Sequence, residues 1–148
     1  MMGLFDTHAH LYDKAFDRDR EEVIHHIFET LDYVVIPSED LVTSEKAVAL
    51  AESHPSLYAA VGIHPQVTKD ATEEALAAIR TLACTHDKVK DVGEIGLDHH
   101  WPVPRQEQYD LFEAQLQLAK ELDLPVSVND REAHAEMYEL LRKYKPRG

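Results

Sequence analysis

Strand-like and helix-like segments alternate along the whole chain, and this alternation constrains the fold more than any other feature. The segments expected as strands are short and apolar or β-branched, and they cover 4–6, 33–36, 57–62, 89–93 and 126–128. The segments expected as helices carry apolar residues at helical spacing, and they cover 17–31, 43–53, 72–83 and 105–122, with a last one through Met137, Leu140 and Leu141. Such regular alternation predicts an α/β fold with a parallel sheet and right-handed crossovers.

The positions of polar side chains distinguish two parallel-sheet architectures. Residues able to do chemistry follow nearly every expected strand, at His8 and His10, His64, Glu94 and 129–131. An open doubly wound sheet gathers its ligands at one switch point, and no G-x-G-x-x-G loop follows the first strand here. Functional groups after most strands are typical of a (βα)8 barrel, which needs eight units. We therefore expect a partial TIM barrel of about five βα units.

Two histidines, His8 and His10, stand directly after the first expected strand in Asp6-Thr7-His8-Ala9-His10. In an extended strand, residues two apart point to the same face, so the spacing directs both imidazoles toward one point. Neutral imidazole is the commonest metal-binding side-chain group. The pair predicts half of a divalent-metal site, and a chance pair of exposed histidines is the alternative.

Glu94 lies between two glycines in the segment Val92-Gly93-Glu94-Ile95-Gly96-Leu97-Asp98, at the end of the fourth expected strand. A carboxylate there can bind a hard or borderline cation and can bridge two of them. The alternative is a glycine-flanked turn with solvated acids. Asp98 is expected either to orient a ligand or to cap a turn.

Three further side chains belong to the same expected rim. His64, in Gly62-Ile63-His64-Pro65, is interpreted either as a structural histidine or as one that contacts a ligand or the substrate. Arg131 has a planar guanidinium suited to clamping a phosphate, and an ion pair with Asp130 or Glu132 is an equal alternative. Trp101 is expected in a loop at the substrate mouth, where its ring can stack on a base.

Charge and composition restrict the partners of the chain. The formal net charge is −13, which repels nucleic acid at long range and argues against a broad, passive DNA-binding surface. It does not exclude an enzyme that acts on a phosphodiester, because bound divalent cations reverse the local potential. The single cysteine cannot form an internal disulfide, and no apolar run reaches the length of a membrane span. We expect a cytoplasmic protein that does not associate with membranes.

Taken together and in order, several segments resemble the TatD family of metal-dependent deoxyribonucleases, within the amidohydrolase-like TIM barrels. The matching segments are DTHAHL at 6–11, VGIHP at 61–65, GEIGLD at 93–98 and RQEQYDLFEAQLQLAKELDLPV at 105–126. The segment NDREA at 129–133 falls where the family has a His-x-Arg-Asp-Ala type of segment. This resemblance implies a single TatD-like domain over 1–148 that stops before the family's sixth strand.

The resemblance also implies roles for particular residues. His8 and His10 would bind one divalent ion, and Glu94 would bridge toward a second, with Mg, Mn or Zn as the metal. Arg131 would lie beside the scissile phosphate as a second catalytic residue, with His64 on the same rim. The implied reaction is the hydrolysis of DNA phosphodiester bonds by metal-activated water.

Two departures from the family pattern bear on activity. The family has a metal-binding histidine where this chain has Asn129, so the second ion is expected to bind weakly. The chain also stops before the family's later histidine and an aspartate that helps to activate water. A non-catalytic half-barrel, kept as a relic or as an assembly partner, is therefore an alternative function. A hydrolase of amide or ester bonds is another.

A half-barrel is also expected to have structural consequences. The first and fifth strands would be unpaired edges of a parallel sheet. Five side chains expected to face the barrel interior would lack an opposing wall, namely Val34, Ile36, Val61, Val92 and Val126. We therefore expect marginal stability alone, a homodimer, or completion by another chain that carries the remaining strands.

Overall fold

A computed structural model describes residues 3–147 and contains one sheet of five parallel strands in the order β1-β2-β3-β4-β5. The strands are β1 (Phe5–Asp6), β2 (Tyr33–Ile36), β3 (Leu57–Val61), β4 (Val89–Asp98) and β5 (Val126–Arg131). Within this described part of the chain, each strand pairs only with its neighbours in sequence, as in a barrel and unlike a doubly wound sheet. The predicted α/β half-barrel of about five βα units is confirmed.

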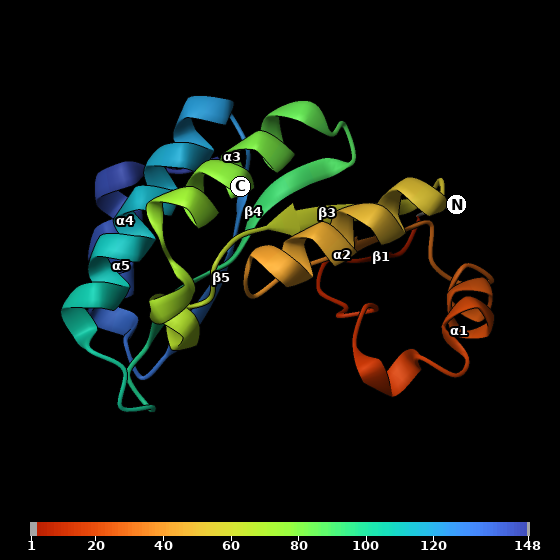
Figure 1. Ribbon diagram of the computed structural model, residues 1–148, viewed down its shortest axis with the longest axis horizontal. Coiled ribbons are helices and arrows are strands. Elements are labelled where there is room, and N and C mark those ends of the chain that lie inside the picture. The colour runs from red at the N-terminus through yellow and green to blue at the C-terminus, as the bar shows by residue number, and fades with distance from the viewer. Residues whose placement is uncertain (1–2, 148) are drawn as a thin grey trace.

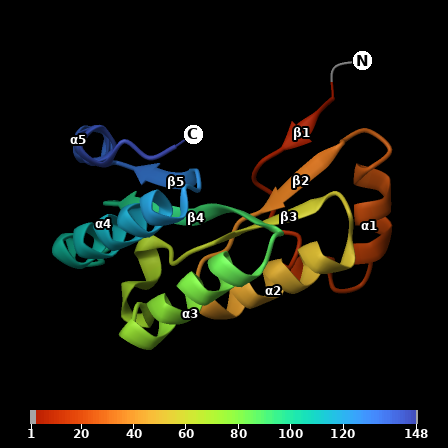
Figure 2. The ribbon, with the colours of Figure 1, turned by 90° about the horizontal axis from the view of Figure 1, so that it is seen from above.

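In the described residues, five α-helices connect and follow the strands, and the sheet curls so that the helices lie outside it (Figures 1 and 2). They are α1 (Arg20–Ile27), α2 (Leu41–Ser53), α3 (Glu73–Thr85), α4 (Arg105–Leu122) and α5 (His134–Tyr144), with two short 3-10 helices, η1 (Lys14–Phe16) and η2 (Pro65–Asp70). The opposite side of the sheet is concave, and in Figure 2 it opens toward the top of the picture. Among residues 3–147, no helix is long and apolar enough to cross a membrane.

Strands β4 and β5 are longer than the sequence predicts, since they end at Asp98 and Arg131 rather than at 93 and 128. Gly, Asp and Asn disfavour strands, so composition places these ends in loops. Parallel pairing nevertheless continues from Gly96 to Asn129 and on to Asp98 with Arg131. A side chain at Gly96, where φ is 139°, would collide with the Asn129 carbonyl, so this close approach requires glycine.

The first two helices also differ locally from expectation. Helix α1 is confined to Arg20–Ile27, inside the expected 17–31, because turns occupy 17–19 and 28–30. Helix α2 begins at Leu41, and its N-cap is Asp40 rather than Thr43 or Ser44. The Asp40 carboxylate accepts a hydrogen bond from the Thr43 amide at 2.7 Å, and Thr43 Oγ1 accepts one from the Asp40 amide at 2.9 Å. This reciprocal capping box fixes the start of α2.

The core lies between the sheet and its helices, which corrects one prediction about the strands. Val34, Ile36, Val61 and Val92 are fully buried, and Val126 packs beside Val92 in one of the two apolar clusters. These side chains contact the helical layer, so the prediction that they face an empty barrel interior is wrong. Both faces of a barrel strand can be apolar. The alternation of side chains along a strand therefore does not indicate which face the helices cover.

The concave face instead presents the alternate residues of the strands. Phe5 and Tyr33 are directly opposite in register, and their rings stack with centroids 5.4 Å apart. Tyr58 continues this aromatic row at 5.8 Å from Tyr33. Phe5 is 61% exposed and Tyr33 is 42% exposed, so an aromatic strip lies uncovered on this face.

Candidate metal centre

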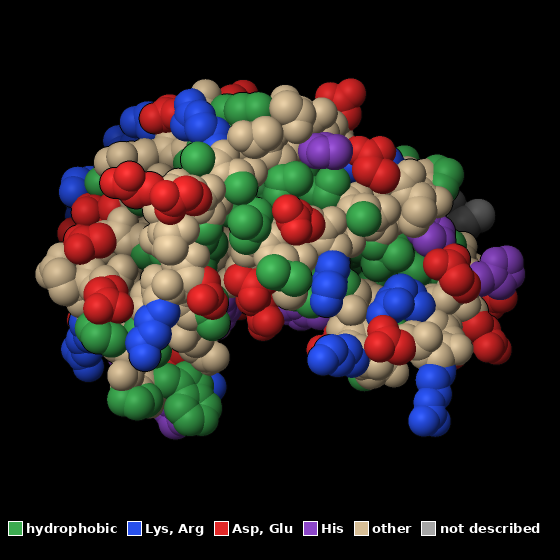
Figure 3. All heavy atoms as spheres, in the orientation of Figure 1, with side chains coloured by type: hydrophobic (Ala, Val, Ile, Leu, Met, Phe, Trp, Pro, Cys, Tyr) green, Lys and Arg blue, Asp and Glu red, His purple; other side chains and the backbone are tan. Residues whose placement is uncertain are grey.

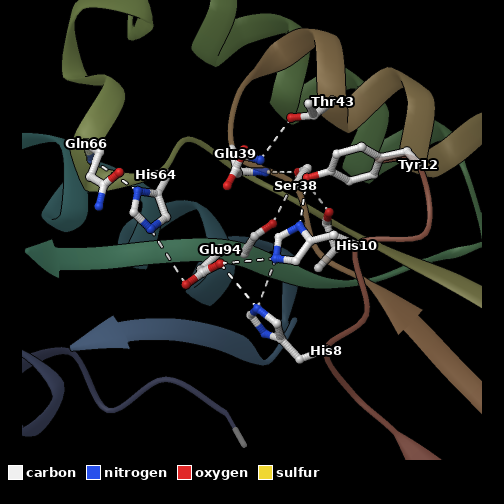
Figure 4. Close-up of polar contacts among 12 residues, drawn as sticks. His8, His10, Tyr12, Ser38, Glu39, Thr43, His64, Gln66 and Glu94 are labelled. Atoms are coloured by element: carbon white, nitrogen blue, oxygen red, sulfur yellow. Dashed lines mark hydrogen bonds and ion pairs between the residues drawn. The ribbon is translucent and has the colours of Figure 1, made fainter. Parts of the chain in front are cut away.

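Two strands bring the three predicted metal ligands together on the concave side. Beyond β1, the Ala9 amide still donates a hydrogen bond to the Val35 carbonyl at 3.2 Å, so 8–10 stays extended beside β2. His8 and His10 therefore point to one side, as their spacing predicts. On β4, the Glu94 amide donates to the carbonyl of Ser38 at 2.8 Å, which anchors Glu94. Figure 4 shows the three side chains converging.

The contacts among these three side chains are short. His8 Nε2 lies 3.2 Å from His10 Nε2, and Glu94 Oε2 lies 3.3 Å from the first and 3.7 Å from the second. The point equidistant from these atoms lies about 2.0 Å from each, which matches the usual length of a Zn–N or Zn–O bond. Three lone-pair atoms this close require a proton or a cation between them. The donor set and its geometry therefore fit a divalent ion, and it is the one such group found among residues 3–147.

Tyr12 contacts the ring nitrogen of His10 that does not face Glu94. Its hydroxyl oxygen lies 2.8 Å from His10 Nδ1, and the two rings meet edge to face. With the ring nitrogen Nδ1 donating its hydrogen to this oxygen, Nε2 keeps a lone pair directed at Glu94. Burial raises the pKa of Tyr12, and the nearby Glu39 carboxylate raises it further, so the phenol stays protonated. Sequence reasoning missed this residue, although it continues the two-residue alternation of His8 and His10.

His64 is buried and approaches Glu94 from the other side, with Nε2 3.7 Å from Glu94 Oε1. Its Nδ1 accepts a hydrogen bond from the Gln66 amide at 3.1 Å, so the hydrogen of the neutral ring is on Nε2 and faces the carboxylate. Burial raises the pKa of Glu94, but His64, and then His8 and His10, lower it by more, so the net shift is downward. Glu94 is thus held as a carboxylate, with Oε2 toward His8 and His10 and Oε1 toward His64.

Asp98, at the end of β4, joins two segments around the rim. It is buried, and it accepts hydrogen bonds from Gln66 Nε2 at 2.7 Å and from the His100 amide at 3.1 Å. Gln108 of α4 closes the strand end, because it accepts from the Asp98 amide at 2.8 Å and donates to the carbonyls of Asp98 and Val103. Asp98 therefore does more than cap a turn: it ties the segment that carries His64 to the loop at 99–104. No sequence motif marks Gln66 and Gln108 as hydrogen-bond partners of Asp98.

Arg131 and Trp101 lie together at the ends of β4 and β5, where the His100 ring meets the Trp101 ring edge to face and the His99 amide donates a hydrogen bond to the Arg131 carbonyl. The guanidinium carbon of Arg131 is 5.9 Å from the centre of the Trp101 ring, and Trp101 is half exposed in its loop. Arg131 pairs with Asp98 on β4, which follows Glu94 by four residues, or about 13 Å of extended strand. The alternative of an ion pair with Asp130 or Glu132 is not found, since these acids contact histidines instead.

Asn129 occupies the position at which the resemblance implies a further metal-binding histidine. Its side-chain nitrogen donates a hydrogen bond to the Leu97 carbonyl at 3.0 Å. The amide therefore bridges β4 and β5, and it lies outside the cluster of His8, His10 and Glu94.

The fold and the metal centre together define a class of protein. A curled parallel sheet with two histidines after β1 and a glutamate on β4 is the arrangement of a metal-dependent hydrolase of the TIM-barrel type. A family model described as TatD related DNase matches residues 5–148. The chain belongs to this TatD family.

Individual relatives agree with this assignment. The chain is 40% identical over 142 residues to the uncharacterized metal-dependent hydrolase YabD of Bacillus subtilis, covering 95% of this chain and 55% of the relative. It is 34% identical over 148 residues to the 3'-5' ssDNA/RNA exonuclease TatD of Erwinia tasmaniensis, covering 97% and 56%. The crystal structure of the Escherichia coli TatD homolog YJJV superposes with a TM-score of 0.90 at 30% identity, covering 97% and 56%. The chain thus spans about half the length of the relatives it matches.

Proposed function

We propose that this chain forms the metal-binding part of a hydrolase that cleaves phosphodiester bonds in DNA. The observation that carries the proposal is the convergence of His8, His10 and Glu94, with ligand atoms within 4.8 Å of one another. The relative from Erwinia tasmaniensis is named as an exonuclease on single-stranded DNA or RNA, which supports nucleic acid as the substrate class. Since the chain matches about half of that relative, the activity of a whole protein stays a proposal.

The donor set indicates which metal fits. Two imidazoles and one carboxylate suit Zn²⁺ or Mn²⁺ better than Mg²⁺, which prefers oxygen ligands and keeps several waters. When bound, such an ion supplies an activated water and polarises the phosphoryl oxygen. A second ion has no complete set of ligands among residues 3–147.

The other residues around the metal centre would position the metal ligands or the substrate and would not take part in the reaction themselves. Tyr12 fixes the His10 tautomer, and His64 directs an N–H toward Glu94 Oε1. We place Arg131 and Trp101 in substrate binding at the outer rim, where the guanidinium meets a phosphate and the exposed indole meets a base. Arg131 pairs with Asp98 at the end of β4, four residues of strand from Glu94, and this position supports contact with a nucleotide next to the cleaved bond.

A cleavage assay tests the proposal directly. The purified chain is incubated with 3'- or 5'-labelled single-stranded DNA and with Zn²⁺, Mn²⁺ or Mg²⁺ in separate reactions. We expect metal-dependent shortening that is lost in Glu94→Gln and in His8→Ala, with exposed His26→Ala as the matched control. Absence of metal-dependent cleavage, or cleavage unchanged in both variants, rejects an activity of this chain alone.

A half-barrel that acts as an assembly partner is the second candidate, and the open concave face favours it. The strip of Phe5, Tyr33 and Tyr58 is an apolar surface of the kind that partners cover. In this case the chain binds a metal but cleaves only when a second copy or another chain supplies the remaining strands. Sedimentation across a range of concentrations tests for the second copy, and Tyr33→Lys should prevent its formation. A monomer at every concentration excludes the homodimer.

A further inference from the structure

A groove beside the metal centre has the opposite charge to the chain as a whole. It lies between α2 and the segment that links β1 to α1, and its volume is about 470 Å³. Its walls include Tyr12, Lys14 and Arg20 on one side and Lys46, Leu50 and Ser53 on the other. Three of these side chains are cationic, and Asp17 is the one acid in the lining.

Arg20 and Asp17 build the groove and leave little charge for a ligand. Arg20 Nε donates to the Leu11 carbonyl at 2.8 Å, and Nη2 donates to the carbonyls of Tyr12 and Asp13. The same Nη2 pairs with Asp17 Oδ1 at 2.6 Å, so these two charges offset each other. Arg20 thereby fixes the course of the loop after β1, from which Tyr12 and Lys14 project.

Lys14 and Lys46 supply the charge that remains. Among residues 3–147, neither ammonium group has a carboxylate within ion-pair distance, although the chain carries 28 acidic side chains. Figure 3 shows Lys and Arg side chains beside the hollow of the molecule, with Asp and Glu side chains between them. Two unpaired cations in a groove are the electrostatic requirement for binding an anion.

Tyr12 connects this groove to the metal centre. Its ring lines the groove, and its hydroxyl contacts His10 Nδ1 at 2.8 Å, so a single side chain separates the two sites. In Figure 4, Tyr12 lies between α2 and the three metal-binding side chains. An extended polyanion with one phosphate at His8, His10 and Glu94 would pass Tyr12 and enter the groove.

We propose that Lys14 and Lys46 bind a backbone phosphate of single-stranded nucleic acid, next to the phosphodiester held at the metal centre. This inference rests on the proposed function and adds a path for the strand. It also gives a polyanion a place to bind on a chain with a net charge of −13, because the groove lining carries three cations and one acid. The apolar wall of Leu50 and the Tyr12 ring faces the sugar.

Binding without metal separates this site from the metal centre. Anisotropy of a fluorescein-labelled single-stranded oligonucleotide is measured in EDTA for the parent and for Lys14→Ala/Lys46→Ala, over a series of salt concentrations. The matched control is Lys90→Ala/Lys120→Ala, which removes two exposed lysines outside the groove. We expect the groove variant to bind about 10-fold more weakly at low salt, with the salt slope reduced by about 0.7 for one lost phosphate contact.

The outcomes are distinguishable from failure of the proposed function. Equal weakening in the groove variant and the control, or no weakening in the groove variant, overturns the phosphate site even if the chain cleaves DNA. Weakening confined to the groove variant supports it even if the parent does not cleave. A competition experiment with inorganic phosphate tests the alternative ligand. If phosphate saturates the groove and the oligonucleotide fails to displace it, the groove binds free phosphate and the proposal that a nucleic acid strand passes through it is wrong. Where cleavage occurs, the groove variant should raise KM and leave kcat unchanged.

Discussion

Asp91 on β4 is a partly buried acid with one oxygen that lacks a hydrogen-bond partner among residues 3–147, and replacing it with asparagine should stabilise the fold. Its Oδ2 accepts a hydrogen bond from Ser127 Oγ on β5, but its Oδ1 is shielded from solvent and has no hydrogen-bond partner within residues 3–147. Burial raises the pKa of Asp91 to about 6, against an opposing effect of the Ser127 hydrogen bond and a smaller one of His8. The folded state therefore carries a penalty for the ionised carboxylate.

The sign and size of this penalty follow from linkage. Because the pKa is raised from 3.8 in the unfolded chain to about 6, the folded state binds more protons between these values. The free energy of unfolding therefore decreases as the pH rises from about 4 to about 6, and it is constant above that range. Two pKa units correspond to about 3 kcal/mol, which is the full penalty at pH 7.5, and about half of it applies at pH 5.

Urea unfolding followed by far-UV circular dichroism measures the effect. The Asp91→Asn variant cannot ionise at this position, so its free energy of unfolding should exceed the parent's by about 2–3 kcal/mol at pH 7.5. The gain should fall by about half at pH 5. Exposed Asp87→Asn is the control, and it should change stability by less than about 0.5 kcal/mol at both pH values. A destabilised Asp91→Asn variant at pH 7.5, or a gain independent of pH, would refute the reasoning.

Three further substitutions probe the site and its support. Glu94→Gln keeps the shape of the side chain but removes its charge, so Zn²⁺ affinity by calorimetric titration should fall at least about 100-fold; unchanged affinity would exclude Glu94 as a ligand. Tyr12→Phe removes the oxygen that faces His10 Nδ1 and should weaken Zn²⁺ binding about 10-fold in the same titration, whereas an equal affinity would show that His10 needs no such support. Gln108→Leu leaves the buried Asp98 amide and carbonyl without partners and should lower the free energy of unfolding by about 2–4 kcal/mol in urea, a result contradicted by a loss below about 0.5 kcal/mol.

Much of the fold was predictable because its signals are local. The alternation of β-branched runs with helical periodicity predicts the order of elements, and that order alone leads to a parallel sheet. The spacing of His8 and His10 likewise predicts a shared direction, because it depends only on strand geometry. The proximity of Glu94 is not local, and the sequence indicated it through the order of motifs and the rule that such groups gather at strand ends.

The features that sequence reasoning missed depend on contacts between distant segments. The concave orientation of Tyr33, rather than Val34, is set by which face the helices cover, and the two faces are similarly apolar. The Trp101 contact of Arg131 requires β5 to continue three residues beyond its apolar part, which only pairing with β4 supports. These are consequences of tertiary register, and periodicity carries no information about them.

The curl of the sheet is what makes the metal centre possible. In a flat sheet, β1 and β4 would lie three inter-strand spacings apart, or about 14 Å. His8 and Glu94 nevertheless approach to 3.3 Å, so the sheet must curve across β2 and β3 for their side chains to meet. Among residues 3–147, the helices pack on the convex side of these strands, where Val34, Ile36 and Val61 are fully buried. That packing holds the curve among the described residues, so the apolar face and the ligand face of the same strands act together to place two histidines and one carboxylate around a single point.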